Sequence, residues 1–230
     1  DMMTLFKKKL DNEVKVSKKN FATTNLLDYV VVIIPARGGS KRLKNKNILK
    51  LNKRPLVLWT LDNLNKLKYL FSDILVSSDS EIIQKISKQI NVLFLRRPNY
   101  LSHGKATSEA AAFHAINFYK KKFGFIKYVI LFQVTSPFRK NITIKKAIKL
   151  SKMFPNKQIV AVNKKNLEPN GVIYLTPVNL LKKYKCFSHK GFIPLIINSK
   201  KESLDIDYKT DLIKAKKYLK KINKKKFYIL

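Results

Sequence analysis

The residues best suited to chemistry in this chain lie between Arg37 and Asn47, in a loop that combines glycine with cations. Gly38 and Gly39 carry no side chains, so backbone N–H groups there can approach a ligand closely. The cationic side chains around this backbone are Arg37, Lys41, Arg42, Lys44 and Lys46. A ligand of such a loop should carry several negative charges, which predicts polyphosphate. The plain alternative is a β-turn with solvated lysines.

Two common phosphate-binding patterns do not describe this loop. The P-loop pattern G-x-x-x-x-G-K-[ST] needs a wider glycine spacing than the run Gly38-Gly39-Ser40-Lys41 offers. The dinucleotide fingerprint G-x-G-x-x-G does not occur in the chain, which disfavours a dinucleotide site.

The 14 acidic residues are few, and two of them form the pair Asp205 and Asp207. Side chains alternate along an extended segment, so the carboxylates on either side of Ile206 would share one face. Two carboxylates beside a polyphosphate suit Mg²⁺, with water and phosphate oxygens completing the octahedron. The pair therefore predicts a Mg²⁺ site. The alternative is that Asp207 or Asp211 only caps the following helix.

The elements that would position these groups alternate between strands and helices. Apolar, β-branched runs predict strands at 30–34, 73–77, 92–95, 128–132, 159–162, 172–175 and 193–197. Helical spacing predicts helices at 56–67, from 80–81 onward, and at 108–119, 142–154 and 209–219. This alternation predicts an α/β fold with a mostly parallel, doubly wound, Rossmann-like sheet and helices on both faces.

Four polar motifs directly follow predicted strands. They are Arg37–Asn47, Ser77-Ser78-Asp79, Arg96-Arg97-Pro98 and Gln133–Arg139. In parallel sheets ligands bind beyond the carboxyl ends of the strands, so we expect these motifs to meet at one site.

Composition limits the remaining possibilities. The formal net charge of +35 suggests nucleic acid or an anionic membrane as a partner, but the lysines are spread along the chain rather than gathered on one basic face. A nucleic-acid-binding module, which is the alternative function, would need a cationic stripe with stacking aromatic side chains. The single cysteine, Cys186, excludes an internal disulfide. No apolar run is long enough to span a bilayer, and residues 1–28 lack a signal-like apolar stretch. We expect a cytoplasmic protein without a membrane or nucleic-acid partner, with a basic extension at 1–28 and one domain at 29–230.

Several strings in this chain resemble the N-acylneuraminate cytidylyltransferase family. The run Ile34-Pro35-Ala36-Arg37-Gly38-Gly39-Ser40-Lys41, followed by Lys46-Asn47, is similar to that family's signature I-P-A-R-x-G-S-K and K-N. Gln133–Arg139 is similar to Q-P-T-S-P-L-R, Asn170–Tyr174 to N-G-A-I-Y, and Leu204–Leu212 to a terminal D-I-D-T-x-x-D-L. The resemblance extends from about Tyr29 to Leu219.

The resemblance implies a nucleotidyltransferase that moves CMP from CTP to a nine-carbon, sialic-type sugar acid and releases pyrophosphate. The sugar's anomeric hydroxyl would attack the α-phosphate in line, with Mg²⁺ held by Asp205 and Asp207. The expected nucleotide-binding residues are Ala36, Arg37, Gly38, Gly39, Ser40, Asn47, Asp79 and Arg97. The expected sugar-acid contacts are Gln133, Ser136 and Arg139, and the expected catalytic residues are Arg37, Lys46 and Asp207.

One departure from the family pattern concerns assembly. In relatives a long excursion precedes the N-G-A-I-Y strand, crosses to a second subunit and supplies basic groups to the partner's sugar site. Here only Asn163–Pro169 occupies that position. The family's homodimer is therefore doubtful, and a trimmed relative that binds nucleotide with little or no turnover is the alternative to an active enzyme.

Overall fold

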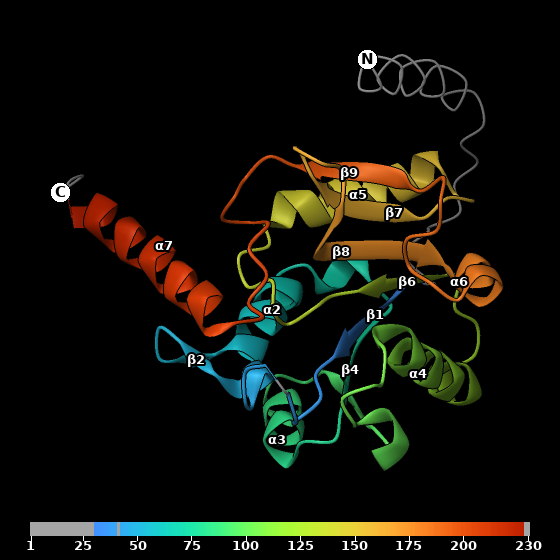
Figure 1. Ribbon diagram of the computed structural model, residues 1–230. Helices are drawn as coiled ribbons and strands as arrows, with labels where there is room; N and C mark the ends of the chain where they lie inside the picture. Colours follow the sequence, from blue (N-terminus) through green and yellow to red (C-terminus); the bar gives the residue numbers. More distant parts are fainter. Residues whose placement is uncertain (1–29, 41, 228–230) are drawn as a thin grey trace.

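A seven-stranded sheet forms the centre of the protein, as the computed structural model in Figure 1 shows; it describes residues 30–40 and 42–227. The predicted extension at 1–28 and Lys41 lie outside these described residues. The strands are β1 (Val30–Pro35), β4 (Asp73–Ser78), β5 (Leu93–Arg96), β6 (Tyr128–Leu131), β7 (Ile159–Asn163), β8 (Pro169–Pro177) and β9 (Ile193–Ile197). Their order across the sheet is β5-β4-β1-β6-β8-β7-β9.

The sheet is mostly parallel, as predicted. β1 pairs in parallel with β4 and β6, β4 with β5, and β7 with β9. β8 is the exception, because it runs antiparallel to both of its neighbours, β6 and β7. The start of β8 therefore lies at the edge of the sheet where the parallel strands end.

Helices cover both faces of the sheet, which confirms the doubly wound arrangement. The helices are α2 (Leu56–Asn65), α3 (Glu81–Gln89), α4 (Ser108–Phe123), α5 (Asn141–Met153), α6 (Val178–Tyr184) and α7 (Lys209–Phe227). The side chains of alternate β1 residues pack into two different hydrophobic cores, one on each face of the sheet. Val30, Val32 and Ile34 pack with α2, α3, α5 and α7, whereas Val31 and Ile33 pack with α4 and α6. β1 is thus buried on both sides, as its unbroken Val and Ile run predicts.

Two short elements are absent from the sequence prediction. A small hairpin joins β2 (Lys50–Leu51) to β3 (Arg54–Pro55), and α6 follows β8. The hairpin turns through Asn52 and Lys53, both with positive φ, and its two-residue strands are too short to show a period. α6 has only seven residues, so its helical pattern is equally brief.

The connection between β7 and β8 is a tight hairpin, which takes the place of the long excursion. Asn163 N–H donates to the carbonyl of Glu168 at 2.9 Å, and Leu167 N–H donates back to Asn163 at 3.0 Å. Leu167 adopts a positive φ of 56° at this turn. In the described part of the chain, no helix combines the length and apolar character needed to cross a membrane.

Candidate active site

The loops after β1, β4 and β5 are joined by hydrogen bonds at the carboxyl edge of the sheet, as predicted. Ala36 N–H donates to the carbonyl of Ser77 at 2.9 Å, and Gly38 N–H donates to Asp79 Oδ1 at 2.6 Å. A Cβ atom on Gly38 would lie 3.3 Å from the Cβ of Ser80, so a side chain there would press against the loop after β4. Gly38 thus permits this close approach of two loops.

Other contacts fix the shape of the glycine loop. The Asn47 side-chain amide is buried and donates to the carbonyl of Arg37 at 2.8 Å, while Arg37 Nη1 donates to the carbonyl of His103 at 2.7 Å. Around Gly39 the space is open, since no atom lies within 4 Å of a Cβ built there. The loop is therefore held at both ends and accessible at Gly39, where a phosphate could approach the backbone.

Arg97 is buried and supports the loop after β4. Its Nη2 donates to the carbonyl of Ser77 at 2.8 Å and its Nε to the hydroxyl of the same residue at 3.3 Å. Burial lowers the pKa of Arg97 to about 10, although the charge of Asp79 opposes this shift. The side chain stays cationic at neutral pH.

Arg139 is also buried, and it connects the loop after β6 to β8. Its Nη2 donates to the carbonyl of Gln133 at 3.0 Å, and its Nε donates to the carbonyl of Val172. The guanidinium lies 4.3 Å from the ring centroid of Phe132. Burial lowers the pKa of Arg139 to about 9, with the charges of Glu202 and Asp205 acting in the opposite direction. These contacts make Arg139 a support for the segment that carries Gln133 and Ser136.

Gln133 and Ser136 meet the start of β8, because β8 runs in the opposite direction to its neighbours. A Cβ on Gly171 would lie 2.6 Å from Gln133 Oε1 and 3.5 Å from Ser136 Oγ. Ser136 Oγ and the side-chain nitrogen of the neighbouring Asn170 are buried and have no hydrogen-bond partner in the structure. Unpaired buried polar atoms cost about 1–3 kcal/mol each, so this cluster is suited to a polar ligand.

We expect Gly171→Ala to destabilise the protein by about 1–2 kcal/mol, because Gly171 has a φ of +77° and the new methyl group would displace the Gln133 side chain. Urea unfolding of the variant measures this change. Adding Gln133→Ala should recover the part caused by the contact but not the backbone part. A double variant no more stable than Gly171→Ala would show that Gln133 does not cause the strain.

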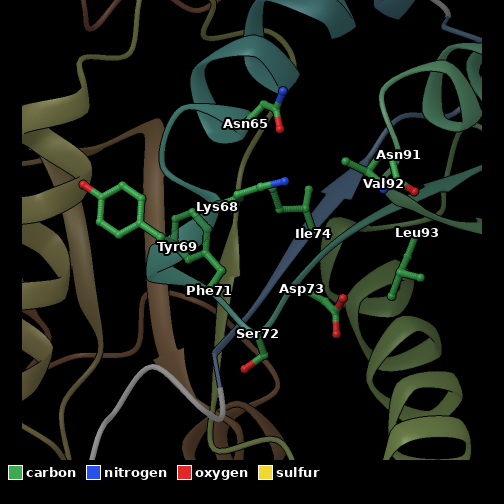
Figure 2. Close-up of a pocket in the computed structure, with 10 residues that line it drawn as sticks. All are labelled: Asn65, Lys68, Tyr69, Phe71, Ser72, Asp73, Ile74, Asn91, Val92 and Leu93. Carbon is green, nitrogen blue, oxygen red and sulfur yellow. The ribbon is translucent and has the colours of Figure 1, made fainter.

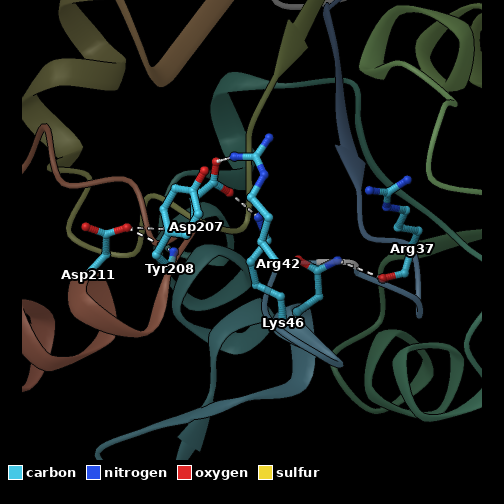
Figure 3. Close-up of polar contacts among 7 residues, drawn as sticks. Arg37, Arg42, Lys46, Asp207, Tyr208 and Asp211 are labelled. Atoms are coloured by element: carbon cyan, nitrogen blue, oxygen red, sulfur yellow. Dashed lines mark hydrogen bonds and ion pairs between the residues drawn. The ribbon is translucent and has the colours of Figure 1, made fainter.

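Asp207 lies opposite two cations of the glycine loop (Figure 3). Arg42 Nη1 donates to Asp207 Oδ2 at 2.5 Å, and Lys46 Nζ donates to Asp207 Oδ1. The Lys46 side chain is 16% exposed and that of Arg42 is 56% exposed. Burial acts to raise the pKa of Asp207, but the hydrogen bond and charge of Lys46, together with Arg42, bring that pKa below its usual value.

Asp205 lies in a different environment from Asp207. The residue between them, Ile206, is fully buried, and its N–H donates to the carbonyl of Thr135 at 2.8 Å. Burial raises the pKa of Asp205; a hydrogen bond with the Thr135 side chain opposes this, and the charge of Asp207 adds to it. Asp205 Oδ1 is buried without a hydrogen-bond partner.

Of the two carboxylates, Asp205 has an oxygen that a Mg²⁺ ion could use directly, whereas both oxygens of Asp207 accept from Arg42 and Lys46. The described residues contain no group of three or more His, Cys, Asp or Glu that could hold a metal by itself. Mg²⁺ is commonly bound by one or two carboxylates with substrate phosphates and water, and Asp205 Oδ1 is an unpaired oxygen ready for such a role. Asp211 is used differently, since its Oδ2 accepts the N–H groups of Asp207 and Tyr208 and caps α7.

Two groups at this site are missing from the sequence-based list of site residues. Arg42 was noted only as one of the loop cations, and its contact joins positions 165 residues apart, which spacing cannot reveal. Asn170 was noted only within the Asn-Gly motif. The Asn-Gly motif is the sequence signal that points to Asn170, because the motif's glycine, Gly171, lies against Gln133 in the structure.

A cavity of about 540 Å³ lies away from this site (Figure 2). Its lining includes Asp73, the first residue of β4, and Leu93, the first residue of β5. It therefore opens at the amino edge of the sheet, opposite the loops described above.

The sequence was compared with protein families and with known proteins. Residues 31–229 match the family described as Cytidylyltransferase. The chain is 30% identical to a CMP-N,N'-diacetyllegionaminic acid synthase of Legionella pneumophila, over 79% of this chain and 92% of that protein. It is 35% identical to an N-acylneuraminate cytidylyltransferase of Escherichia coli over 144 residues, which cover 63% of this chain and only 33% of that protein. The chain thus spans about a third of the Escherichia coli protein's length.

A solved structure supports the fold. The structure of CMP:2-keto-3-deoxy-manno-octonic acid synthetase complexed with CTP superposes with a TM-score of 0.66 at 12% identity, covering 84% of this chain and 99% of that chain. A 4-diphosphocytidyl-2C-methyl-D-erythritol synthase from Anaerococcus prevotii superposes with a TM-score of 0.61 at 16% identity, covering 84% and 99%. With the sequence matches, which include N-acylneuraminate cytidylyltransferases, the chain belongs to the cytidylyltransferase family.

Proposed function

We propose that this protein transfers CMP from CTP to a nine-carbon sugar acid of the sialic type and releases pyrophosphate. The observation that carries the proposal is the meeting of Asp207 with Lys46 and Arg42 beside the glycine loop. Cations for a polyphosphate and carboxylates for its metal thereby lie together. The alignment with the Legionella pneumophila relative over 92% of that protein's length supports the same class of substrate.

Each group in the site has a distinct role in this proposal. The backbone around Gly39, with Arg37 and Lys46, holds the triphosphate, and the loop after β6 with Asn170 orients the sugar acid. Asp205 and Asp207 would hold Mg²⁺, which neutralises phosphate charge when bound. The reaction requires little covalent chemistry from the protein, so positioning and charge stabilisation supply the rate enhancement.

The test is to incubate the protein with CTP, Mg²⁺ and each of several acids, including sialic, legionaminic and pseudaminic acid, and to measure pyrophosphate. We expect release with at least one acid and none with CTP alone. The competing proposal is that the protein is a trimmed relative of these enzymes and binds nucleotide without turnover. The short hairpin between β7 and β8 favours this alternative. Tight binding of CTP, with no pyrophosphate released in the presence of any of these acids, would support the competing proposal and contradict the enzymatic one.

Among nucleotides, CTP with Mg²⁺ is expected to give the largest thermal stabilisation. At a concentration one hundredfold above its Kd, the gain is about 2.7 kcal/mol, which a melting curve resolves. ATP, GTP and UTP at the same concentration serve as matched controls. Equal shifts from all four would leave a general polyphosphate site and remove the assignment to cytidine.

We also expect the protein to be a monomer, or a dimer that dissociates at low salt. The alignment with the Legionella pneumophila relative is 221 positions long yet takes in 79% of this chain, so that relative has residues without a counterpart here. The net charge of +35 adds repulsion between copies, which is strongest where screening is weakest. Sedimentation at low and physiological salt measures this. A dimer that persists at low salt would mean that another surface forms the interface.

A further inference from the structure

A second region with a defined chemical character lies at the amino edge of the sheet, opposite the candidate active site. It is built from the end of α4, the loop into β6, and α6. A pocket of about 380 Å³ is lined there by Lys120, Phe125, Lys127, Pro155 and Lys182, among others. Tyr128 begins β6 and Pro177 ends the antiparallel β8, and both residues also line the pocket, which fixes its position at this edge.

The charge of this region is mainly positive. The residues that line the pocket belong to the segments 118–128, 155–158 and 177–185, which contain four, one and three lysines and no Asp or Glu. The carboxylate of Asp73 lies next to the first segment, where it accepts a hydrogen bond from Tyr119. Among the described residues, the ion pairs with carboxylates, such as those of Arg42 and Lys46 with Asp207 and of Arg54 with Asp62, involve no lysine of these segments. The lysines of this region therefore present an uncompensated positive potential to solvent.

The same region exposes aromatic side chains. Phe123 is 46% exposed and Phe125 is 62% exposed, and they are the two phenylalanines among the exposed large apolar side chains of the described residues. They lie on either side of Gly124, whose positive φ of 96° ends α4 and turns the chain outward. Lys122 Nζ lies 5.3 Å from the ring centroid of Phe123, so charge and ring share one surface.

We propose that this basic aromatic surface (Lys120, Phe123, Phe125, Lys127 and Lys182) binds the surface of an anionic lipid bilayer. The lysines would attract acidic headgroups, and the two rings would enter the boundary between headgroups and acyl chains. The candidate active site lies at the opposite edge of the sheet and would stay open to solution in this orientation. The sequence predicts no membrane partner, because the lysines are spread along the chain and no segment is apolar enough to span a bilayer; the proposal departs from that expectation in this one region. The inference does not depend on the proposed enzymatic function.

Sedimentation of the full chain with vesicles tests the proposal. We expect binding to phosphatidylcholine vesicles that contain phosphatidylglycerol and little binding to phosphatidylcholine alone. Lys127→Gln with Lys182→Gln should weaken binding by on the order of tenfold, and Phe125→Ser by a similar factor. Matched controls lie on α5, which packs on one face of the sheet. They are Lys145→Gln with Lys149→Gln, and Ile142→Ser, all at exposed positions.

Fluorescence gives a second readout that diffuse charge would not produce. The emission of Phe125→Trp should shift to shorter wavelength on addition of the anionic vesicles, whereas that of Ile142→Trp should not. Equal loss from the α5 controls, equal binding to neutral vesicles, or no binding at low ionic strength would each overturn the proposal. So would a loss of RNA binding in the lysine and Phe125→Ser variants that exceeds their loss of vesicle binding, because the surface would then be a nucleic-acid site.

Discussion

Asp207→Asn is expected to reduce turnover by about 100-fold or more while the protein remains folded. The amide keeps the shape of the side chain but loses the charge that balances Lys46 and Arg42 and that, in the proposed mechanism, would hold Mg²⁺. The stability loss should be about 1–3 kcal/mol, because the Asp207 side chain is only 31% exposed and the variant leaves the more buried Lys46 without its counter-charge. Pyrophosphate release at saturating CTP measures turnover, and circular dichroism monitors the fold.

Two further variants test whether the loss of turnover arises at the proposed metal site. Asp205→Asn should cause a similar loss, whereas Asp211→Asn should be milder because Asp211 caps α7. Full activity of Asp207→Asn would show that the metal site is wrongly assigned.

The acid side of the pH profile adds a check on the same pair. The pKa of Asp205 is raised and that of Asp207 is lowered, so acidification protonates Asp205 first. Mg²⁺-dependent activity should therefore fall through the pKa of Asp205 as the pH decreases. Raising the Mg²⁺ concentration should move this limb to lower pH.

The second large effect is expected at Lys46, where Lys46→Gln should lower kcat/KM by about 100-fold. Its side chain is 16% exposed, so little water screens the attraction of its charge for a phosphate. Arg42→Gln also removes a positive charge that is paired with Asp207, but the Arg42 side chain is 56% exposed. We expect less than about tenfold loss there. Steady-state kinetics with CTP varied compares the two, and equal losses would show that burial does not distinguish the two cations.

Much of the fold follows from local sequence signals. The Val30–Ile34 run predicted a strand buried on both faces, and its alternate residues do pack into two separate cores. The glycine pair predicts that the backbone approaches a ligand closely, and that role stays a prediction; the structure shows Gly38 against the loop after β4. The strand depends on residues near one another in the chain, which is why a sequence pattern can reveal it, whereas the contact of Gly38 joins residues 41 positions apart.

Features that depend on distant contacts were harder to predict. Arg139 was expected to contact the sugar acid, and that role stays a prediction. The structure places its donors on the carbonyls of Gln133 and Val172, an arrangement that depends on the reversed direction of β8. The same reversal brings Asn170 and Gly171 to Gln133. Alternation of strands and helices predicts parallel neighbours and does not indicate one antiparallel strand within the sheet.

The 161-residue separation between Lys46 and Asp207 has a consequence for the protein during its synthesis. Chains are made from the amino end at about 5–20 residues per second, so the carboxylate is added roughly 8–32 s after the lysine. During that interval the cationic loop has been made, but the aspartates that oppose it have not. The nascent chain thus contains a cationic loop well before the carboxylate that pairs with Lys46 and Arg42 has been made.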